Sequence, residues 1–172
     1  MQNAELQTAL RHTREATEPI VKYIVLAVMI ALTWTAPISA QSSQSAESEV
    51  LSVVTALFDG MRKVDSGMVR PLFHAKARLI SLDSRRPGAT IEESVEGFIQ
   101  SIGRPRTEVF DERISNVKTM IDGSLASVWA DYKFFRGTTL NHCGVDHFLL
   151  VKEGGSWRII ELSDTRRREN CE

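Results

Sequence analysis

The segment from Ala126 to Leu162 constrains the fold more than any other part of the chain. Two long runs of alternating residues meet at Gly154–Gly155, which predicts a long β-hairpin. Apolar residues occur on both faces of these runs, whereas a sheet with one face in water alternates between apolar and polar residues. Both faces of the hairpin are therefore expected to be covered.

Turn signals divide the rest of the second half of the chain into further strands. Asp122–Gly123 is a strong hairpin signal, and Gly137 marks another turn. Together with a short strand near the middle of the chain, the expected strands cover residues 77–82, 107–121, 124–136, 141–152 and 157–163. Strands joined by tight turns pair antiparallel, so a meander is expected.

The part of the chain before these strands predicts helices. From Glu49 the apolar residues recur at spacings of three and four, which gives one apolar helical stripe. Its members are Val50, Val53, Val54, Leu57, Phe58 and Met61. Asp65 is expected to cap a short second helix, and Thr90 with Glu93 a third helix as a capping box. Helices followed by an antiparallel meander place the chain in the α+β class.

An export signal is predicted at residues 1–40. Lys22 is followed by the apolar run YIVLAVMIALTW and then by the small-residue end Pro37–Ala40, which is the order of a signal peptide. The polar residues before Lys22 form a long n-region, unless translation begins at Val21. The apolar run is shorter than the ~20 residues that span a bilayer. Cleavage after Ala40 is therefore preferred to a lasting membrane anchor, and a periplasmic or secreted location follows.

The mature chain is expected to consist of a short leader and one domain. Residues 41–48 are rich in Ser and Gln and poor in apolar residues, so a flexible leader is predicted before a domain at 49–172. Both cysteines, Cys143 and Cys171, lie in this domain. An even number of cysteines in an exported chain is typical of a disulfide. Two free thiols are the alternative.

The charge of the chain argues against nucleic acid or an acidic membrane as a partner. Lys and Arg total 21 against 22 Asp and Glu, which gives a net charge of −1. No strong positive field is expected from this balance. The blocks Arg85–Arg86 and Arg166–Arg168 are interpreted as solvated ends rather than as a track for phosphates.

The outer face of the expected sheet predicts a second copy of the chain. On one strand Tyr132 and Trp129 point to opposite faces, and on the next strand Asp146 and His147 do the same. Helices can cover one face. Because the other face is also apolar, a second copy is the simplest cover for it. We therefore predict a homodimer through the sheet.

The order of the elements, together with three segments, resembles the nuclear transport factor 2-like superfamily, which includes SnoaL-like proteins and ketosteroid isomerases. The segments are VVTALFDGMRKVDSGMVRPLF, VWADYKFF and GVDHFLLVKEGGSWRII, and the resemblance runs from Glu49 to Thr165. It implies a cone, in which three N-terminal helices pack on a curved antiparallel sheet and an apolar pocket opens at one end. The residues expected to line this pocket are Val128, Phe134, Phe148, Leu150 and Trp157.

The resemblance also implies a residue-by-residue comparison with the ketosteroid isomerases. Val145–Phe148 is similar to the VDHF-like strand of that family, in which the aspartate stays protonated and donates to a developing oxyanion. Asp146 is the matching residue. The tyrosine of the family falls at Leu57, which has no hydroxyl, and its general base falls near Ser81. Steroid isomerase activity is therefore not expected.

Asp146, Tyr132 and His142 are the candidate catalytic residues, because they are polar groups set among apolar neighbours. Asp146 can act as an acid or only stabilise the sheet through a hydrogen bond. Tyr132 can donate a hydrogen bond to a ligand or only fill space in the core. His142 can be a general base or a surface histidine. His147 is interpreted as structural, and His74 as a residue at a helix C-terminus.

No cofactor or metal is predicted. The chain has no glycine-rich nucleotide motif and no nucleophile elbow. The adjacent pairs His142–Cys143 and Asp146–His147 point apart on a strand, so they do not converge on a metal.

Three functions remain open. The first is an exported module that binds a small apolar or amphipathic molecule, oriented by Tyr132 and Asp146. The second is a SnoaL-like or ketosteroid isomerase-like enzyme that transfers a proton or dehydrates a carbonyl compound. The third is a structural dimer without a ligand.

Overall fold

The structure is a computed structural model that describes residues 38–171. Most of the predicted export signal, residues 1–37, lies outside the described residues. The chain divides after Ala40, and Gln41–Glu172 forms the compact unit that carries the sheet. None of the helices in the described range combines the length and the hydrophobicity that a membrane span requires.

The described residues form three helices, a short 3₁₀ turn and six strands. The helical elements are α2 (Ile38–Lys63), α3 (Ser66–Val69), η1 (Arg70–Leu72) and α4 (Val95–Ile102). The strands are β1 (Phe73–Asp83), β2 (Thr90–Glu93), β3 (Phe110–Asp122), β4 (Leu125–Arg136), β5 (Thr139–Glu153) and β6 (Ser156–Arg166).

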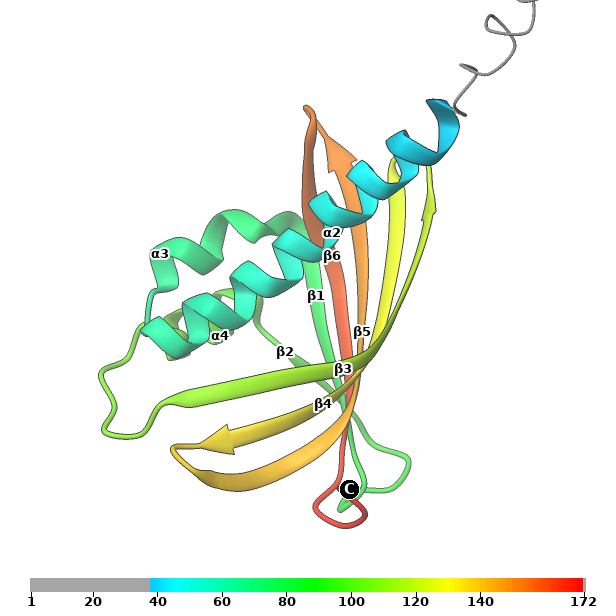
Figure 1. The fold of residues 1–172 in the computed structure, drawn as a ribbon. Coiled ribbons are helices and arrows are strands. Elements are labelled where there is room, and N and C mark those ends of the chain that lie inside the picture. Colours follow the sequence, from blue (N-terminus) through cyan, green and yellow to red (C-terminus); the bar gives the residue numbers. More distant parts are fainter. Residues whose placement is uncertain (1–37, 172) are drawn as a thin grey trace, which may run out of the picture. The chain divides into compact units, whose positions relative to one another are not determined.

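The six strands form one sheet in the order β2-β1-β6-β5-β4-β3. Neighbouring strands are antiparallel except β1 and β6, which run parallel. The sheet is curved, and the helices lie on its concave side (Figure 1). We call this side the inner face and the opposite side the outer face. The predicted α+β fold, with helices packed on a curved sheet, is confirmed.

Tight turns and bulges determine the path of the sheet. The predicted turn at Gly154–Gly155 joins β5 to β6, and both glycines have positive φ, 57° and 81°, as a two-residue hairpin loop requires. The pairing of β3 with β4 shifts register between Ser115 and Lys118, and that of β4 with β5 shifts after Phe134. A bulge adds a residue to one strand and bends it, so β3, β4 and β5 can curve around the helices.

The predicted apolar stripe of α2 packs on the inner face of β4 and β5. Leu57 and Phe58 of the helix are buried, and so are Phe148 and Leu150 of β5. The rings of Phe58 and Phe148 meet edge to face with 6.0 Å between their centroids. Burial of each such side chain stabilises the fold by about 1.5–3 kcal/mol, so this layer holds α2 on the sheet.

Three local predictions were wrong. Residues 41–48, expected as a flexible leader, belong to α2, because Ala, Gln and Glu favour a helix even without an apolar stripe. Thr90–Glu93 pairs with β1 as β2 instead of starting a helix, and Ser94 caps α4. His74 lies in β1 beside Glu153 and not at a helix end.

The outer face keeps several large apolar side chains exposed. Met120 is 68% exposed, and Leu125 and Trp129 are each 49% exposed. His147 lies on the same face, with its ring 6.1 Å from that of Trp129 and its Nε2 2.9 Å from Ser127 Oγ. The homodimer predicted from the sequence would cover this face, and it stays a prediction.

Candidate functional site

A row of polar side chains crosses the inner face where β1, β6 and β5 run side by side. The register places Ser81 of β1 opposite Asp164 of β6, and Asp164 opposite Asp146 of β5. Tyr132 of β4 joins the row, because its hydroxyl lies 3.3 Å from Asp164 Oδ2. Four strands therefore bring polar groups that are distant in the sequence into one cluster.

Asp164 is the centre of this cluster. It accepts a hydrogen bond from Ser81 Oγ at 2.5 Å and from Arg166 Nε at 2.6 Å, and Arg166 Nη2 lies 3.2 Å from its other oxygen. Charge-assisted hydrogen bonds of this kind are short and strong. The ion pair with Arg166 therefore holds the Asp164 side chain in place and offsets its charge.

Asp146 and Glu112 form a pair of carboxyl groups behind Asp164. Asp146 is 3% exposed, and burial raises its pKa well above the usual value, with repulsion from Glu112 and Asp164 acting in the same direction. Burial also raises the pKa of Glu112, to about 7. No N–H or O–H group of the described residues donates to Asp146 Oδ2. A hydrogen bond between the side chains of Glu112 and Asp146 contributes to both pKa shifts, and two carboxyl groups can form one only when one of them carries a proton.

The hydroxyl group of Tyr132 is already hydrogen-bonded within the protein. Its hydroxyl donates to the backbone oxygen of Thr165 at 3.0 Å, and its side chain is buried. Burial and the nearby charges of Asp164 and Glu112 raise its pKa. Tyr132 therefore stays neutral, and its hydrogen bond to Thr165 links β4 to the end of β6.

His142 differs from the other candidates because it is only partly buried. Its Nδ1 lies 2.9 Å from Asn141 Oδ1, and since that oxygen can only accept, the proton of the neutral ring is on Nδ1. Burial lowers the pKa of His142 to about 4, and the charges of Arg166, Arg168 and Arg85 add to this effect. The ring is therefore neutral at physiological pH, with Nε2 as an acceptor.

Aromatic rings surround His142 on the inner face. The ring of Phe134 lies 4.9 Å from that of His142, and the ring of Phe110 lies 5.3 Å from that of Phe134. All three side chains are partly buried, so they keep some surface open. The guanidinium of Arg106 lies 3.9 Å above Phe110. We call Phe110, Phe134 and His142 the aromatic cluster.

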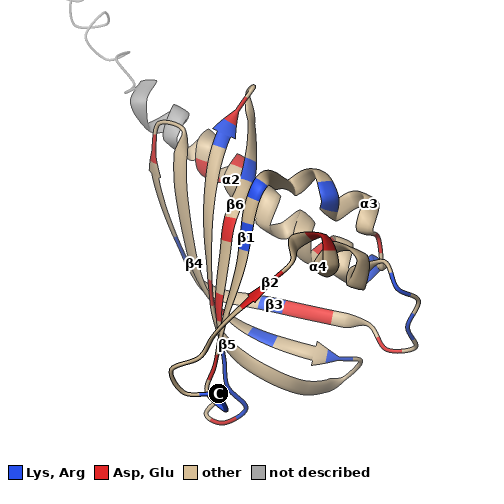
Figure 2. Cartoon of the chain, turned by 180° about the vertical axis from the view of Figure 1, so that it is seen from behind, with Lys and Arg blue, Asp and Glu red and all other residues tan. Residues whose placement is uncertain are grey.

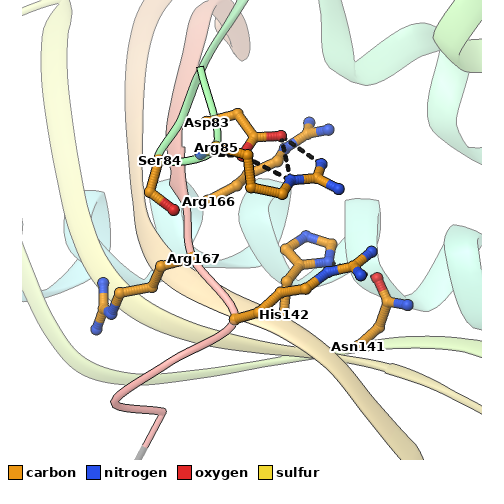
Figure 3. A pocket seen from close by; sticks show the side chains of 8 residues that line it. Asp83, Ser84, Arg85, Asn141, His142, Arg166 and Arg167 are labelled. Atoms are coloured by element: carbon orange, nitrogen blue, oxygen red, sulfur yellow. Dashed lines mark hydrogen bonds and ion pairs between the residues drawn. The ribbon is translucent and has the colours of Figure 1, made fainter. Parts of the chain in front are cut away.

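A pocket of about 130 Å³ opens next to His142 (Figure 3). Its lining comes from the ends of β1 and β6 and the start of β5: Asp83, Ser84, Arg85, Asn141, His142, Arg166, Arg167 and Arg168. Arg85 Nε lies 2.9 and 3.0 Å from the two oxygens of Asp83, and these bonds hold the pKa of Asp83 below its usual range. We call this hollow the arginine pocket; basic segments gather there beside the C terminus (Figure 2).

The C-terminal tail is attached to the sheet at this pocket. Cys143 and Cys171 are joined by a disulfide. Cys143 and Arg167 also exchange two backbone hydrogen bonds of 2.9 Å each. These bonds hold the arginines at the end of β6 next to the strand that carries His142.

The three candidate catalytic residues lie on the inner face in different surroundings. Asp146 and Tyr132 are enclosed, whereas His142 lines the arginine pocket. The residues expected to line an apolar pocket pack in or against the hydrophobic core: Val128, Phe134, Phe148, Leu150 and Trp157. The described part of the chain holds no group of three His, Cys, Asp or Glu residues placed to bind a metal.

The sequence matches a family model described as putative lumazine-binding over residues 45–162. The chain belongs to this family. The match to the putative lumazine-binding model includes the aromatic cluster, and it ends two residues before Asp164. Arg166 and the two arginines after it lie beyond the matched residues. No curated protein matches the chain.

Solved structures share the fold of this putative lumazine-binding domain, and two of the three described next are of nuclear transport factor 2-like proteins. One, of unknown function from Shewanella baltica, is 20% identical, with a TM-score of 0.58 over 73% of this chain and 96% of that chain. A putative scytalone dehydratase from Novosphingobium aromaticivorans is 13% identical, with a TM-score of 0.60 over 75% and 89%. A putative dehydratase from Streptomyces avermitilis is 14% identical, with a TM-score of 0.57 over 73% and 99%. Such identities show the fold alone, and they confirm the resemblance seen in the sequence.

Sequence reasoning missed Glu112, Asp164 and the arginine pocket. The last strand was expected to end at Ser163, so the charged residues after it were interpreted as a solvated end. In the structure β6 continues to Arg166, because it pairs with β1 over this stretch. The signal that could have revealed this is the alternation Leu162, Asp164, Arg166, which continues the inner-face positions of β6.

Proposed function

We propose that this domain binds a small amphipathic molecule whose apolar part lies on the aromatic cluster. The observation that carries the proposal is that Phe110, Phe134 and His142 are only partly buried and that His142 also lines a polar pocket. Ligand sites combine aromatic surface with a few polar groups that fix orientation. The family description names lumazine, a flat heteroaromatic compound, which is the kind of shape that such a surface accepts.

His142 is the polar residue that meets the ligand in this proposal. Asp146 is enclosed and shares its hydrogen bond with Glu112, while the hydroxyl of Tyr132 is bound to Thr165. These two residues shape the wall behind the site. His142 offers an acceptor nitrogen and lies at the junction of the aromatic cluster and the arginine pocket.

The Phe134→Ala variant is expected to bind the aromatic anion 1-anilinonaphthalene-8-sulfonate about tenfold more weakly than the native protein, because an aromatic contact and its buried area are lost. Fluorescence titration measures this change. Phe135→Ala is the matched control, since Phe135 is the next residue of β4 and its ring packs with Arg113 on the other face. Equal affinities of the two variants would show that the ligand does not bind on the aromatic cluster.

We also propose that the domain works in the periplasm or outside the cell. The disulfide between Cys143 and Cys171 supports this location, because disulfides persist in oxidising compartments. N-terminal sequencing of the protein from its native cells should begin at Gln41, and a start at Met1 or Val21 would contradict export by cleavage.

A further inference from the structure

We propose that the arginine pocket binds an oxyanion, a phosphate or carboxylate group, and that this group is the charged end of the amphipathic ligand. The inference deepens the proposed function and rests on it. It is carried by the way the fold brings two arginine blocks, distant in the sequence, to one small hollow beside the aromatic cluster.

The charge of the pocket favours an anion. Four arginines and one aspartate line it. Asp83 offsets the charge of Arg85, and Asp164, behind the pocket, offsets that of Arg166. No described acidic side chain forms an ion pair with Arg167 or Arg168 (the pairs of the described residues lie elsewhere). Arg168 therefore brings to this hollow a positive charge that no described acidic side chain offsets.

Two of the guanidinium groups are held in place and still have donors to offer. A guanidinium carries five N–H donors. Arg85 uses its Nε and Nη2 on Asp83, and Arg166 uses its Nε and Nη2 on Asp164. Neither Nη1 group is bonded to a described residue. Donors fixed in advance lose little entropy when an oxyanion binds, which favours affinity.

The size of the pocket limits what it can hold. A volume of about 130 Å³ is below the roughly 300–1,000 Å³ of sites that enclose a whole small molecule. One functional group fits such a hollow, and the rest of the ligand must extend out of it. Phe134, 4.9 Å from His142, provides the adjacent apolar surface. The head of the ligand therefore lies among arginines and its body on the aromatic cluster.

An anion in the pocket should change the titration of His142. In the empty pocket, burial and the charges of Arg166, Arg168 and Arg85 lower the pKa of this ring to about 4, and only Asp164 opposes them. A bound oxyanion adds a negative charge close to the ring and favours its protonated form. By linkage, the anion must bind more tightly as the ring gains its proton.

The test uses three probes on the full protein: inorganic phosphate, phenyl phosphate and phenol. Isothermal titration calorimetry measures their affinities, and NMR follows the imidazole resonance of His142, assigned by its loss in His142→Asn. Phosphate is expected to bind, phenyl phosphate to bind at least tenfold more tightly than either phosphate or phenol, and the pKa of His142 to rise with either phosphate compound. Equal affinity for the two phosphate compounds would mean that the site takes a free anion and would overturn the head-group assignment.

The decisive variant is Arg168→Gln, with Arg158→Gln as its control. Both changes remove one exposed arginine from the C-terminal region, but Arg158 lies near the start of β6, far along the strand from the pocket. Arg168→Gln is expected to weaken phosphate binding about tenfold, because one charge-assisted contact is lost. Arg158→Gln is expected to leave the affinity within about twofold of the native value. Equal losses would mean a diffuse effect of net charge and would overturn the site.

The anion site and the proposed function can fail separately. Phosphate could fail to bind while 1-anilinonaphthalene-8-sulfonate still binds Phe134→Ala more weakly than Phe135→Ala. The pocket would then not hold the head group, and the aromatic site would stand. If neither probe binds, both proposals fail.

Discussion

The Gly144→Ala variant is expected to lose about 3 kcal/mol of unfolding free energy or more, at the upper end of the usual cost of overpacking. A Cβ at position 144 would overlap the backbone oxygen of Thr165 and lie 2.9 Å from Tyr132 Cε1. Neither obstacle is the free end of a flexible side chain. Backbone must move for alanine to fit, and the polar cluster moves with it.

Urea unfolding of the variant and of the native protein measures this loss. Gly97→Ala is the matched control, because a Cβ at position 97 meets nothing closer than 3.6 Å and alanine favours the helix α4 by up to about 1 kcal/mol. The control should be as stable as the native protein or slightly more stable. A Gly144→Ala protein of native stability would mean that β4, β5 and β6 do not approach each other as described.

The Asp146→Asn variant is expected to be clearly more stable than the native protein at pH 8 and equally stable near pH 4. Burial raises the pKa of Asp146 well above the usual value and that of Glu112 to about 7. An acid whose pKa is raised by folding contributes stability that is fully present below its unfolded pKa and is lost as the pH rises through its folded pKa. An amide at position 146 can still donate to Glu112 and carries no charge to bury.

His142 titrates with the opposite sign over the same range. Its pKa is lowered to about 4 in the folded state, so its contribution to stability is present above its unfolded pKa and is lost as the pH falls. The difference between the variant and the native protein isolates the carboxyl pair, because both contain His142. Urea unfolding between pH 4 and pH 8 measures this difference. Asp122→Asn, at an exposed turn, is the control and should show no such trend; a pH-independent difference for Asp146→Asn would contradict the shared proton.

Local patterns in the sequence predicted most of the fold because the physical causes are themselves local. The turn at Gly154–Gly155 follows from residues that tolerate positive φ. The stripe of α2 follows from helical spacing, and Asp65 caps α3 by accepting from the Met68 N–H at 2.9 Å. Where a distant strand decided the outcome, as for Thr90–Glu93 in β2, local capping signals were misleading.

The candidate site was predicted only in part, because its chemistry depends on contacts between distant strands. The alternation of β4 and β5 placed Tyr132 and Asp146 on the inner face. It could not show that Glu112, on β3, supplies the second carboxyl group of the pair. Nor could it show that Arg85 and Arg168 line the same pocket, because this depends on the parallel pairing of β1 with β6 and on the attachment of the tail at Cys143.

A ligand is expected to lie on the aromatic cluster with its charged end in the arginine pocket. NMR chemical-shift mapping of the full protein with phenyl phosphate measures whether it does. The largest changes are predicted at Phe110, Phe134 and His142 and along Arg166–Arg168. Changes confined to the outer face around Trp129, or no change at saturating probe, would contradict it.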